Sequence, residues 1–368
     1  MALASAPFLT TLPVRASQKR GLLSRLAMGM VYDEGLAATY PKGCKLRVVA
    51  RSGESVKNSS YTWHGLPDGG ACYSADGGWI YVSNSEMSEG RGGVGAIHFD
   101  SFGEIVDAYP ILAGTSRNCA GGKTPWGTWL SCEENGDIGQ VYECDPYGRR
   151  AGLVRAAMGA CNHEGAAVDP ETSQVYMTED IKNGCLYRFT PIEKRNLERG
   201  LLEVGVPDGS KLKWVALTDP AAMSQPLRQQ IPEAARFHGA EGIVYGNRHV
   251  YFTAKRDHRV WSLNLDTNEL RKVYDAGEHD KPILTGVDNI AMSHDGELLV
   301  AEDGGDMQIV VLDERYHATP LVTLHRQPGS EIAGPAFSPD GTRLMFSSQK
   351  GPLGNAMGGT TYELRLPA

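Results

Sequence analysis

The stretch from Cys119 to Asn135 carries the residue types best suited to chemistry. It holds a thiol, Cys119, in a Gly-rich turn, and two adjacent carboxylates, Glu133 and Glu134, at the end of a short apolar segment. Neighbouring side chains of a strand point to opposite faces, so one carboxylate can face a cavity while the other turns away. Cys119 and Glu134 lie 15 residues apart on one expected hairpin. A thiol and a carboxylate placed in this way could meet at one metal ion.

Carboxylates recur at one position in the later part of the chain. Glu164, Glu241 and Asp288 each stand one residue before the small or polar residue that opens an expected inner strand. A single carboxylate at a turn is usually just solvated, but anions repeated around one axis repel each other unless cations lie between them. Clustered carboxylate oxygens favour Ca²⁺ or a similar hard cation, whereas a thiolate such as Cys119 recruits a transition metal such as iron.

These residues belong to a repeat that starts near Lys45. Six segments share one plan: a polar turn, a short apolar strand, a turn that is often Asp-Gly, and a second apolar strand that ends on a polar residue. The ends are Glu86, Glu134, Glu179, Lys255, Asp303 and Gln349, in steps of 48, 45, 76, 48 and 46 residues. This is the length of a four-stranded propeller blade. The sequence therefore predicts an all-β, six-bladed β-propeller, in which the strands 46–50 and 362–366 share one blade and remove the open edges.

The long third step predicts an insertion in an otherwise single propeller domain. The propeller spans residues 41–368, with a rim insertion at about 188–236 in which residues 193–202 are expected to be helical. Residues 1–40 form an N-terminal segment and leading arm. Its Ala4-Ser5-Ala6 either is the remnant of an export signal with its cleavage site or matches one by chance.

Composition excludes several other classes of protein. The 368 residues are 41% hydrophobic with 44 Gly and 20 Pro, which suits a turn-rich globular fold. A net charge of −8 argues against nucleic acid as a partner, and no apolar run approaches the length of a membrane span. The seven Cys form no short Cys-x-x-Cys pair, so no zinc ribbon is indicated. The absence of Gly-x-Ser-x-Gly and of a Walker loop argues against a serine hydrolase and a nucleotide site.

Several motifs form a specific combination. They are Cys-Ala-Gly-Gly at 119–122, Thr-Pro-Trp-Gly-Thr at 124–128, Cys-Glu-Glu at 132–134, Asn-Ser-Glu at 84–86 and the stretch 331–341. Together they resemble the PhoX-type alkaline phosphatases, over roughly residues 40 to 368 and most closely the shorter branch of the family. The resemblance implies a six-bladed propeller, export by the twin-arginine route to the periplasm or the exterior, and a central cluster of Fe³⁺ and Ca²⁺ that hydrolyses phosphate esters.

The resemblance also implies roles for individual residues. By motif, Cys119 is similar to the iron ligand of the family and Glu134 to a metal ligand of the same blade. Other residues on stretches similar to metal-binding ones are Glu86, Glu241, Asp303 and Glu331. The chain departs from the larger members at 349–352, which read Gln-Lys-Gly-Pro instead of Gln-His-Pro-Gly, and it lacks their arginine-glutamate stretch. These departures keep the fold and the metal cluster but leave the substrate open.

Three basic residues are candidates for catalytic roles. Lys255 and Arg256, at the close of the fourth repeat, could contact a phosphate, although an exposed basic turn explains them equally well. His163 either orients Glu164 or is simply a histidine at the mouth of the channel, and the first role is the one expected. The expected partner is a small-molecule phosphate ester, bound by a monomer that is periplasmic or secreted.

Two other functions remain open. The first is a calcium-dependent lactonase of the gluconolactonase type, whose style Glu241-Gly242 and Asp288-Asn289 resemble. The second is a catalytically silent propeller that scaffolds partners. Cys119 separates the phosphatase from the lactonase, because a calcium lactonase has no use for a thiolate ligand. A scaffold would not need acids that recur around the channel.

Overall fold

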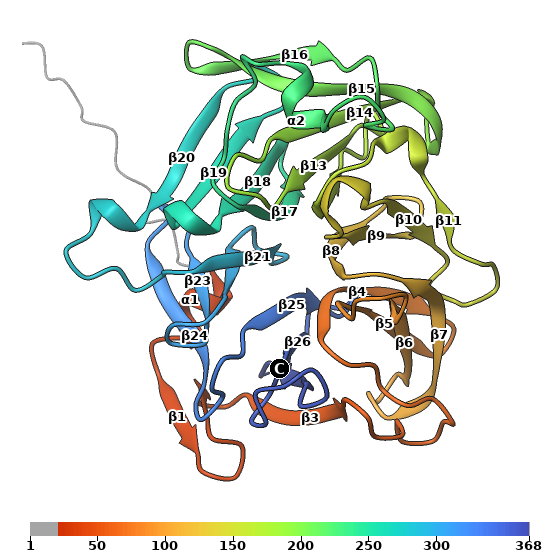
Figure 1. Ribbon diagram of the computed structural model, residues 1–368. Helices are drawn as coiled ribbons and strands as arrows, with labels where there is room; N and C mark the ends of the chain where they lie inside the picture. The colour runs from red at the N-terminus through yellow and green to blue at the C-terminus, as the bar shows by residue number, and fades with distance from the viewer. Residues whose placement is uncertain (1–20, 368) are drawn as a thin grey trace, which may run out of the picture.

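The chain folds into a ring of six β-sheets around a central channel in the computed structural model, which describes residues 21–367 (Figure 1). Neighbouring strands within each sheet pair antiparallel, and each blade places one inner strand beside the channel. The predicted all-β six-bladed propeller is confirmed. The expected export remnant within residues 1–6 lies outside the described residues.

The blades are numbered in chain order from the first inner strand. Blade 1 consists of β4 (Pro67–Ala75), β5 (Gly78–Ser85), β6 (Gly92–Asp100) and β7 (Ile105–Thr115). Blade 2 consists of β8 (Asn118–Lys123), β9 (Trp129–Glu133), β10 (Val141–Cys144) and β11 (Leu153–Val154). Blade 3 consists of β12 (His163–Val168), β13 (Val175–Glu179), β14 (Leu186–Glu193), β15 (Asn196–Asp208) and β16 (Lys211–Ala216).

The second half of the ring repeats this order. Blade 4 consists of β17 (Ala240–Gly246), β18 (His249–Ala254), β19 (Arg259–Asn264) and β20 (Leu270–Asp275). Blade 5 consists of β21 (Val287–Met292), β22 (Leu298–Glu302), β23 (Gln308–Leu312) and β24 (Ala318–Leu324), extended by β2 (Ala38–Pro41) and β1 (Met30–Asp33). Blade 6 consists of β25 (Ile332–Phe337), β26 (Arg343–Ser348), β27 (Thr360–Arg365) and β3 (Lys45–Arg51).

The ring closes through blade 6. Its outer strand β3 comes from the start of the chain and pairs with β27, with Leu46 opposite Leu364 and Ala50 opposite Thr361. The predicted sharing of one blade by the strands 46–50 and 362–366 is therefore confirmed. Every one of the six sheets is held on both sides by a neighbouring sheet, so the propeller has no open end at which it could unwind.

Six hydrophobic clusters fill the six interfaces between neighbouring blades. Second strands such as β22 and β26 are buried on both faces, so they read as continuous apolar runs in the sequence instead of alternating ones. Between blades 5 and 6, for example, Leu299 and Phe346 are fully buried. Packing between sheets, not contacts along the chain, holds each blade in its place in the ring.

Helical structure is sparse in the described residues. It consists of α1 (Leu22–Leu26), α2 (Leu227–Gln230) and the 3₁₀ turns η1 (Gly136–Ile138), η2 (Ala156–Met158), η3 (Lys255–Asp257) and η4 (Ala276–Glu278). Within residues 21–367, no helix has the length and apolar character required to cross a bilayer. The helix α2 is anchored by Arg228, which pairs with Asp137 and, at 3.0 Å, with Glu179.

The expected helix at 193–202 is wrong. The segment forms the turn and first half of a hairpin between β14 and β15, in which Glu193 pairs with Asn196 and Phe189 with Leu202. Leu197 and Leu202 are buried between blades 2 and 3. This burial outweighs the local helical preference of a polar, Glu- and Leu-rich segment, because the third strand of the blade offers an edge that the segment can extend.

The inner strands approach each other closely near the channel axis. A Cβ atom on Gly242 would lie 2.7 Å from Asn289 Cα and 2.7 Å from Ile290 N of the next inner strand. These are backbone atoms that cannot rotate away. A glycine at this position lets blades 4 and 5 come together.

Gly242→Ala is therefore expected to lower the free energy of unfolding by roughly 1–3 kcal/mol, since the neighbouring backbone must shift. Gly29→Ala is the matched control, because a Cβ there meets nothing within 4 Å. Urea unfolding followed by circular dichroism measures both variants. Equal stability of the two variants would contradict the close approach of the inner strands.

Candidate metal centre

The same backbone irregularity occurs in all six inner strands. The register between the inner and the second strand shifts at residues 67–70, 118–121, 163–166, 240–243, 287–290 and 333–336. A bulge of this kind adds an unpaired residue and re-aims its side chain. The first residue inside the shift is, in blade order, Asp68, Cys119, Glu164, Glu241, Asp288 and Gly334. Five of the six carry a side chain able to bind a metal.

A second position repeats just as strictly. It is the residue directly after the second strand, which is Glu86, Glu134, Asp180, Lys255, Asp303 and Gln349 in blade order. In every blade, the amide of this residue donates to the carbonyl of the residue before the inner strand, at 2.8 to 3.2 Å. In blade 6 the residue before the inner strand is Glu331. Its carboxylate lines the cavity in place of the side chain that Gly334 lacks at the bulge.

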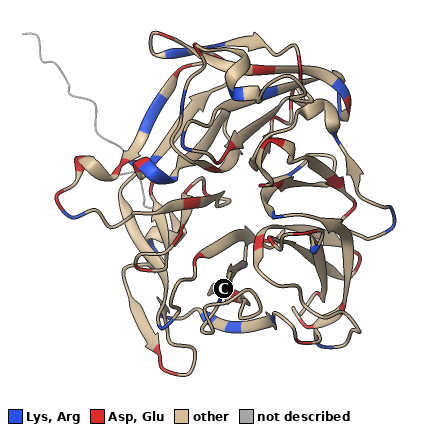
Figure 2. Cartoon of the chain, viewed as in Figure 1, with Lys and Arg blue, Asp and Glu red and all other residues tan. Residues whose placement is uncertain are grey.

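These two sets of residues line one polar cavity of about 560 Å³ at one end of the channel. The structure brings together the eight metal ligands proposed from the sequence: Glu86, Cys119, Glu134, Glu164, Glu241, Asp288, Asp303 and Glu331. It adds Asp68, Asp180, Arg117 and Gln349, which the sequence analysis missed. The repeat could have revealed Asp68 and Asp180, since both occupy the repeated positions. Figure 2 shows acidic segments on several blades around the central opening.

Potential ligand atoms converge in four overlapping groups of three, each within 4.8 Å. They are Asp68–Glu86–Cys119, Cys119–Glu134–Glu164, Glu164–Glu241–Asp288 and Asp288–Asp303–Glu331. Each group shares a residue with the next, so the groups form a continuous chain around the channel. A thiol belongs to the first two groups, whereas the last two are made of carboxylates alone.

The side chain of Glu164 shows that the cavity suits a cation. It is fully buried, and neither of its carboxylate oxygens has a hydrogen-bond partner among the described residues. The Sγ atom of Cys119 lies within 4.8 Å of a Glu164 carboxylate oxygen, close enough to affect the pKa of Glu164. The two groups do not form a hydrogen bond. A buried carboxylate without partners is costly. A metal ion bound by Glu164 would remove that cost.

Burial and mutual repulsion perturb the acids of the cavity. Burial, followed by the charges of Asp288 and Glu134, raises the pKa of Glu164 well above its usual range. Burial, followed by Asp68, does the same for the pKa of the Cys119 thiol. Without metal, these groups therefore keep their protons, and they would lose them to solvent when a cation binds.

Several ligand candidates are held in place by neighbouring donors. The guanidinium of Arg117 contacts Glu134 at 2.6 Å and Glu86 at 3.1 Å. The amide of Gln349 donates to Asp68 at 2.7 Å and to Glu86 at 2.8 Å. Such outer contacts fix the orientation of ligands before a metal binds.

Three acids of the cavity directly follow another acid in the sequence, and that preceding acid turns away from the cavity. Glu133 accepts hydrogen bonds from the amides of Ser116 and Gln140, at 2.8 and 3.1 Å. Glu302 accepts from the amides of Thr285 and Gln308 in the same way. In the pairs 133–134, 179–180 and 302–303, the second residue lines the cavity and the first ties down a loop.

The surroundings of Lys255 and Arg256 differ from those expected of residues that contact a phosphate. Lys255 lines the cavity, but its Nζ lies 2.7 Å from Glu241 and 3.1 Å from Asp303, so carboxylates already surround it. Arg256 does not line the cavity; its half-exposed side chain lies 3.6 Å from Asp180. It sits one position beyond the repeated site and is directed outward.

The expected contact between His163 and Glu164 is absent. The Nε2 atom of His163 lies 2.9 Å from the carbonyl of Gly159, and burial lowers the pKa of the imidazole to about 4. The side chain belongs to the opposite face of β12, because adjacent residues of a strand alternate. His163 is a neutral residue of the blade packing and does not orient Glu164.

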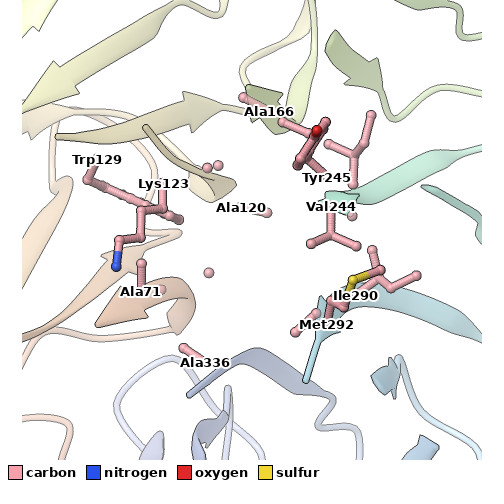
Figure 3. A pocket seen from close by; sticks show the side chains of 18 of the residues that line it. Ala71, Ala120, Lys123, Trp129, Ala166, Val244, Tyr245, Ile290, Met292 and Ala336 are labelled. Carbon is pink, nitrogen blue, oxygen red and sulfur yellow. The ribbon is translucent and has the colours of Figure 1, made fainter. Parts of the chain in front are cut away.

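The other end of the channel is apolar (Figure 3). A cavity of about 500 Å³ is lined there by side chains such as Ala71, Val244, Ile290 and Met292. The single lysine of its lining, Lys123, donates from Nζ to the carbonyl of Cys72 at 2.7 Å. The second bulge residue lines this end in most blades, while the first lines the polar end, so the bulges divide the channel into two chemically different halves.

Comparison with known proteins gives a family and a set of similar folds. The model of the family "Alkaline phosphatase PhoX" matches residues 103–139 and 136–351. PhoX of Pseudomonas fluorescens, solved in complex with vanadate, a transition state analogue, aligns with a TM-score of 0.72 at 16% identity, over 90% of this chain and 96% of that chain. A gluconolactonase of Xanthomonas campestris aligns with a TM-score of 0.55 at 14% identity, over 92% and 94%. No curated protein matches the sequence. At these identities the structural matches establish the fold.

Metal-free protein is expected to lose stability as the pH rises from about 5 to about 7.5. Burial, followed by the charge of Glu86, raises the pKa of Glu134 to about 7 from 4.5. Burial also raises the pKa of Asp288 to about 6. The folded chain then holds protons that the unfolded chain has released, so the free energy of unfolding falls with pH, by roughly 3 kcal/mol for Glu134 alone.

Urea unfolding in a chelating buffer at the two pH values measures this loss. Glu134→Gln should flatten the pH dependence, whereas the exposed Glu193→Gln should leave it unchanged. Stability that stays constant or rises with pH would contradict the perturbed carboxyl groups.

Proposed function

Because the chain belongs to the alkaline phosphatase PhoX family, we propose that it is a metal-dependent phosphatase whose active centre is the polar cavity. The observation that carries the proposal is the convergence of one thiol and nine carboxyl groups on a single cavity, with Glu164 buried and unpartnered. The fold alone would not support it, since propellers of this shape perform unrelated reactions.

The donor set fits iron and calcium. Cys119 belongs to two of the four ligand groups, and a thiolate favours a transition metal such as iron. The groups that contain only carboxylates suit Ca²⁺, which prefers several oxygen ligands. We therefore assign Fe³⁺ to the Cys119 side of the ring and Ca²⁺ to the carboxylate side. Metal ions bound there would neutralise phosphoryl oxygens and activate water for attack.

The cavity lining suggests how the chain would hold the phosphate. A phosphate ester is an anion, and it must enter a cavity rich in carboxylates. Arg117 and Lys255 are engaged with those carboxylates, whereas Arg91 and Lys350 also line the cavity, with Arg91 only 3.6 Å from a single exposed acid. We assign Arg91 and Lys350 to the capture of the phosphate group. Lys350 is also one of the residues at which the chain departs from the larger phosphatases.

The two other functions are less well supported. The gluconolactonase match is weaker, with a TM-score of 0.55 against 0.72, and a calcium lactonase does not require Cys119. A scaffold would not require a buried, unpartnered Glu164. Export to the periplasm or the exterior, and a monomeric state, are further proposals that follow from the resemblance to the family.

Cys119→Ser is expected to remove the iron and to reduce phosphate release from an aryl phosphate at least about 100-fold. A serine hydroxyl does not ionise near neutral pH, whereas a thiol bound to a cation does. Elemental analysis measures the iron, and circular dichroism confirms that the fold is kept.

Cys44→Ser is the matched control, since Cys44 is buried between blades 5 and 6, away from the cavity. It should keep both iron and activity. Full activity of Cys119→Ser would refute the role of the thiolate, and turnover of a lactone without phosphatase activity in the unchanged protein would favour the lactonase.

Arg91→Ala and Lys350→Ala are each expected to raise KM for an aryl phosphate roughly tenfold with little change in kcat, because each removes a charged contact that precedes the reaction. Lys57→Ala, which removes an exposed lysine paired with Glu104 outside the cavity, should leave KM unchanged. An unchanged KM in the double variant would show that other groups capture the phosphate.

A further inference from the structure

Lys255 interrupts the acidic ring at one repeated position. The residue after the second strand is a carboxylate in blades 1, 2, 3 and 5 and the neutral Gln349 in blade 6. Blade 4 alone places a cation there. The amide of Lys255 makes the same bond as its counterparts, to the carbonyl of Gly239 at 2.8 Å, so its side chain starts from the same place as theirs.

The ammonium group of Lys255 lies among three carboxylates. Its Nζ atom is 2.7 Å from Glu241, 3.1 Å from Asp303 and 3.5 Å from Asp288. These carboxylates belong to the two ligand groups that contain no thiol. Lys255 thus contacts members of both groups and joins them.

We propose that Lys255 is a built-in cation that takes the place of one metal ion among the carboxylate-only groups, so that this side of the ring binds one calcium ion fewer than its carboxylates alone could hold. The inference rests on the proposed metal centre for its functional meaning, but the contacts of Lys255 do not depend on the reaction. A buried carboxylate needs a cation, and a covalently attached ammonium supplies one that cannot dissociate.

The charge of Lys255 is secure at neutral pH. Three carboxylates lie within 3.5 Å of its Nζ atom, and negative groups at this distance favour the charged ammonium. With three carboxylates around it, Lys255 cannot also serve as the main contact of a phosphate. Its role is therefore in positioning Glu241, Asp288 and Asp303.

The contacts of Lys255 divide the four ligand groups around the channel into two parts. The groups Asp68–Glu86–Cys119 and Cys119–Glu134–Glu164 include no direct contact of Lys255. Glu164, the unpartnered carboxylate, links this part to the group with Glu241 and Asp288. Replacing the ammonium by a neutral side chain of similar length would leave a gap among three carboxylates, with geometry suited to a divalent ion.

Lys255→Met tests the proposal. The variant is expected to bind about one more calcium ion per chain than the unchanged protein. In a chelating buffer its melting temperature should fall by roughly 5–10 °C, and about 1 mM calcium should restore most of the loss. Calorimetric titration and elemental analysis give the number of bound ions without any activity assay.

Lys272→Met is the matched control, since Lys272 contacts Asp275 at 2.8 Å and Glu278 at 3.0 Å outside the cavity. It should show neither the extra calcium ion nor the calcium-dependent melting. Equal calcium content and equal melting behaviour of Lys255→Met and the unchanged protein would overturn the proposal.

A double variant decides the case in which Lys255→Met does not fold. Lys255→Met combined with Asp303→Asn removes one positive and one negative charge, so it is expected to fold and to bind no extra calcium. If the double variant fails to fold as well, the proposal is overturned. If the unchanged protein holds no metal but Lys255→Met gains calcium, the proposed phosphatase centre fails while the role of Lys255 stands.

Discussion

One backbone hydrogen bond, repeated in all six blades, holds the centre together. It joins the amide after each second strand to the carbonyl before each inner strand, at 2.8 to 3.2 Å. The bond brings the end of one strand to the start of its partner, and the bulge in the inner strand then re-aims one further side chain. Each blade thus delivers two side chains to one level of the channel. Because the ring is closed by β3 and β27, these pairs converge although they are spread over most of the sequence.

The negative charge of the side chains in the polar cavity is the next constraint on the structure. Nine carboxyl groups around one cavity repel each other, and burial adds to the cost of ionising them. The chain offsets part of this charge with its own cations, Arg117 between blades 1 and 2 and Lys255 between blades 4 and 5. Blade 3 carries no such cation at the bulge, and neither carboxylate oxygen of its Glu164 has a hydrogen-bond partner among the described residues. The greatest need for a bound metal is therefore beside Cys119 and Glu164.

The same bulges explain why the potential metal ligands gather at one end of the channel. Five of the six first residues are potential metal ligands that line the polar cavity, and second residues such as Gly69, Ala120 and Gly242 are small and line the apolar one. Small residues are needed there because inner strands of neighbouring blades nearly touch. A lactonase-like propeller and a phosphatase-like propeller can share this framework, since the reaction depends on which side chains occupy the first bulge positions.

The sequence by itself determined the propeller, the closure of the ring and eight members of the acidic cluster. Blade length and the position of Glu164, Glu241 and Asp288 repeat along the chain, which predicted the ring and these three residues. Cys119 and Glu134 were predicted from their spacing on one hairpin, and Glu86, Asp303 and Glu331 from motifs that resemble those of the family. The tertiary structure decided what repetition does not encode. It showed that Lys255 is enclosed by carboxylates and that His163 faces the blade packing. It also turned the expected helix at 193–202 into a hairpin. These outcomes depend on contacts between blades that are distant in sequence, and a single repeat contains no information about its neighbours in the ring.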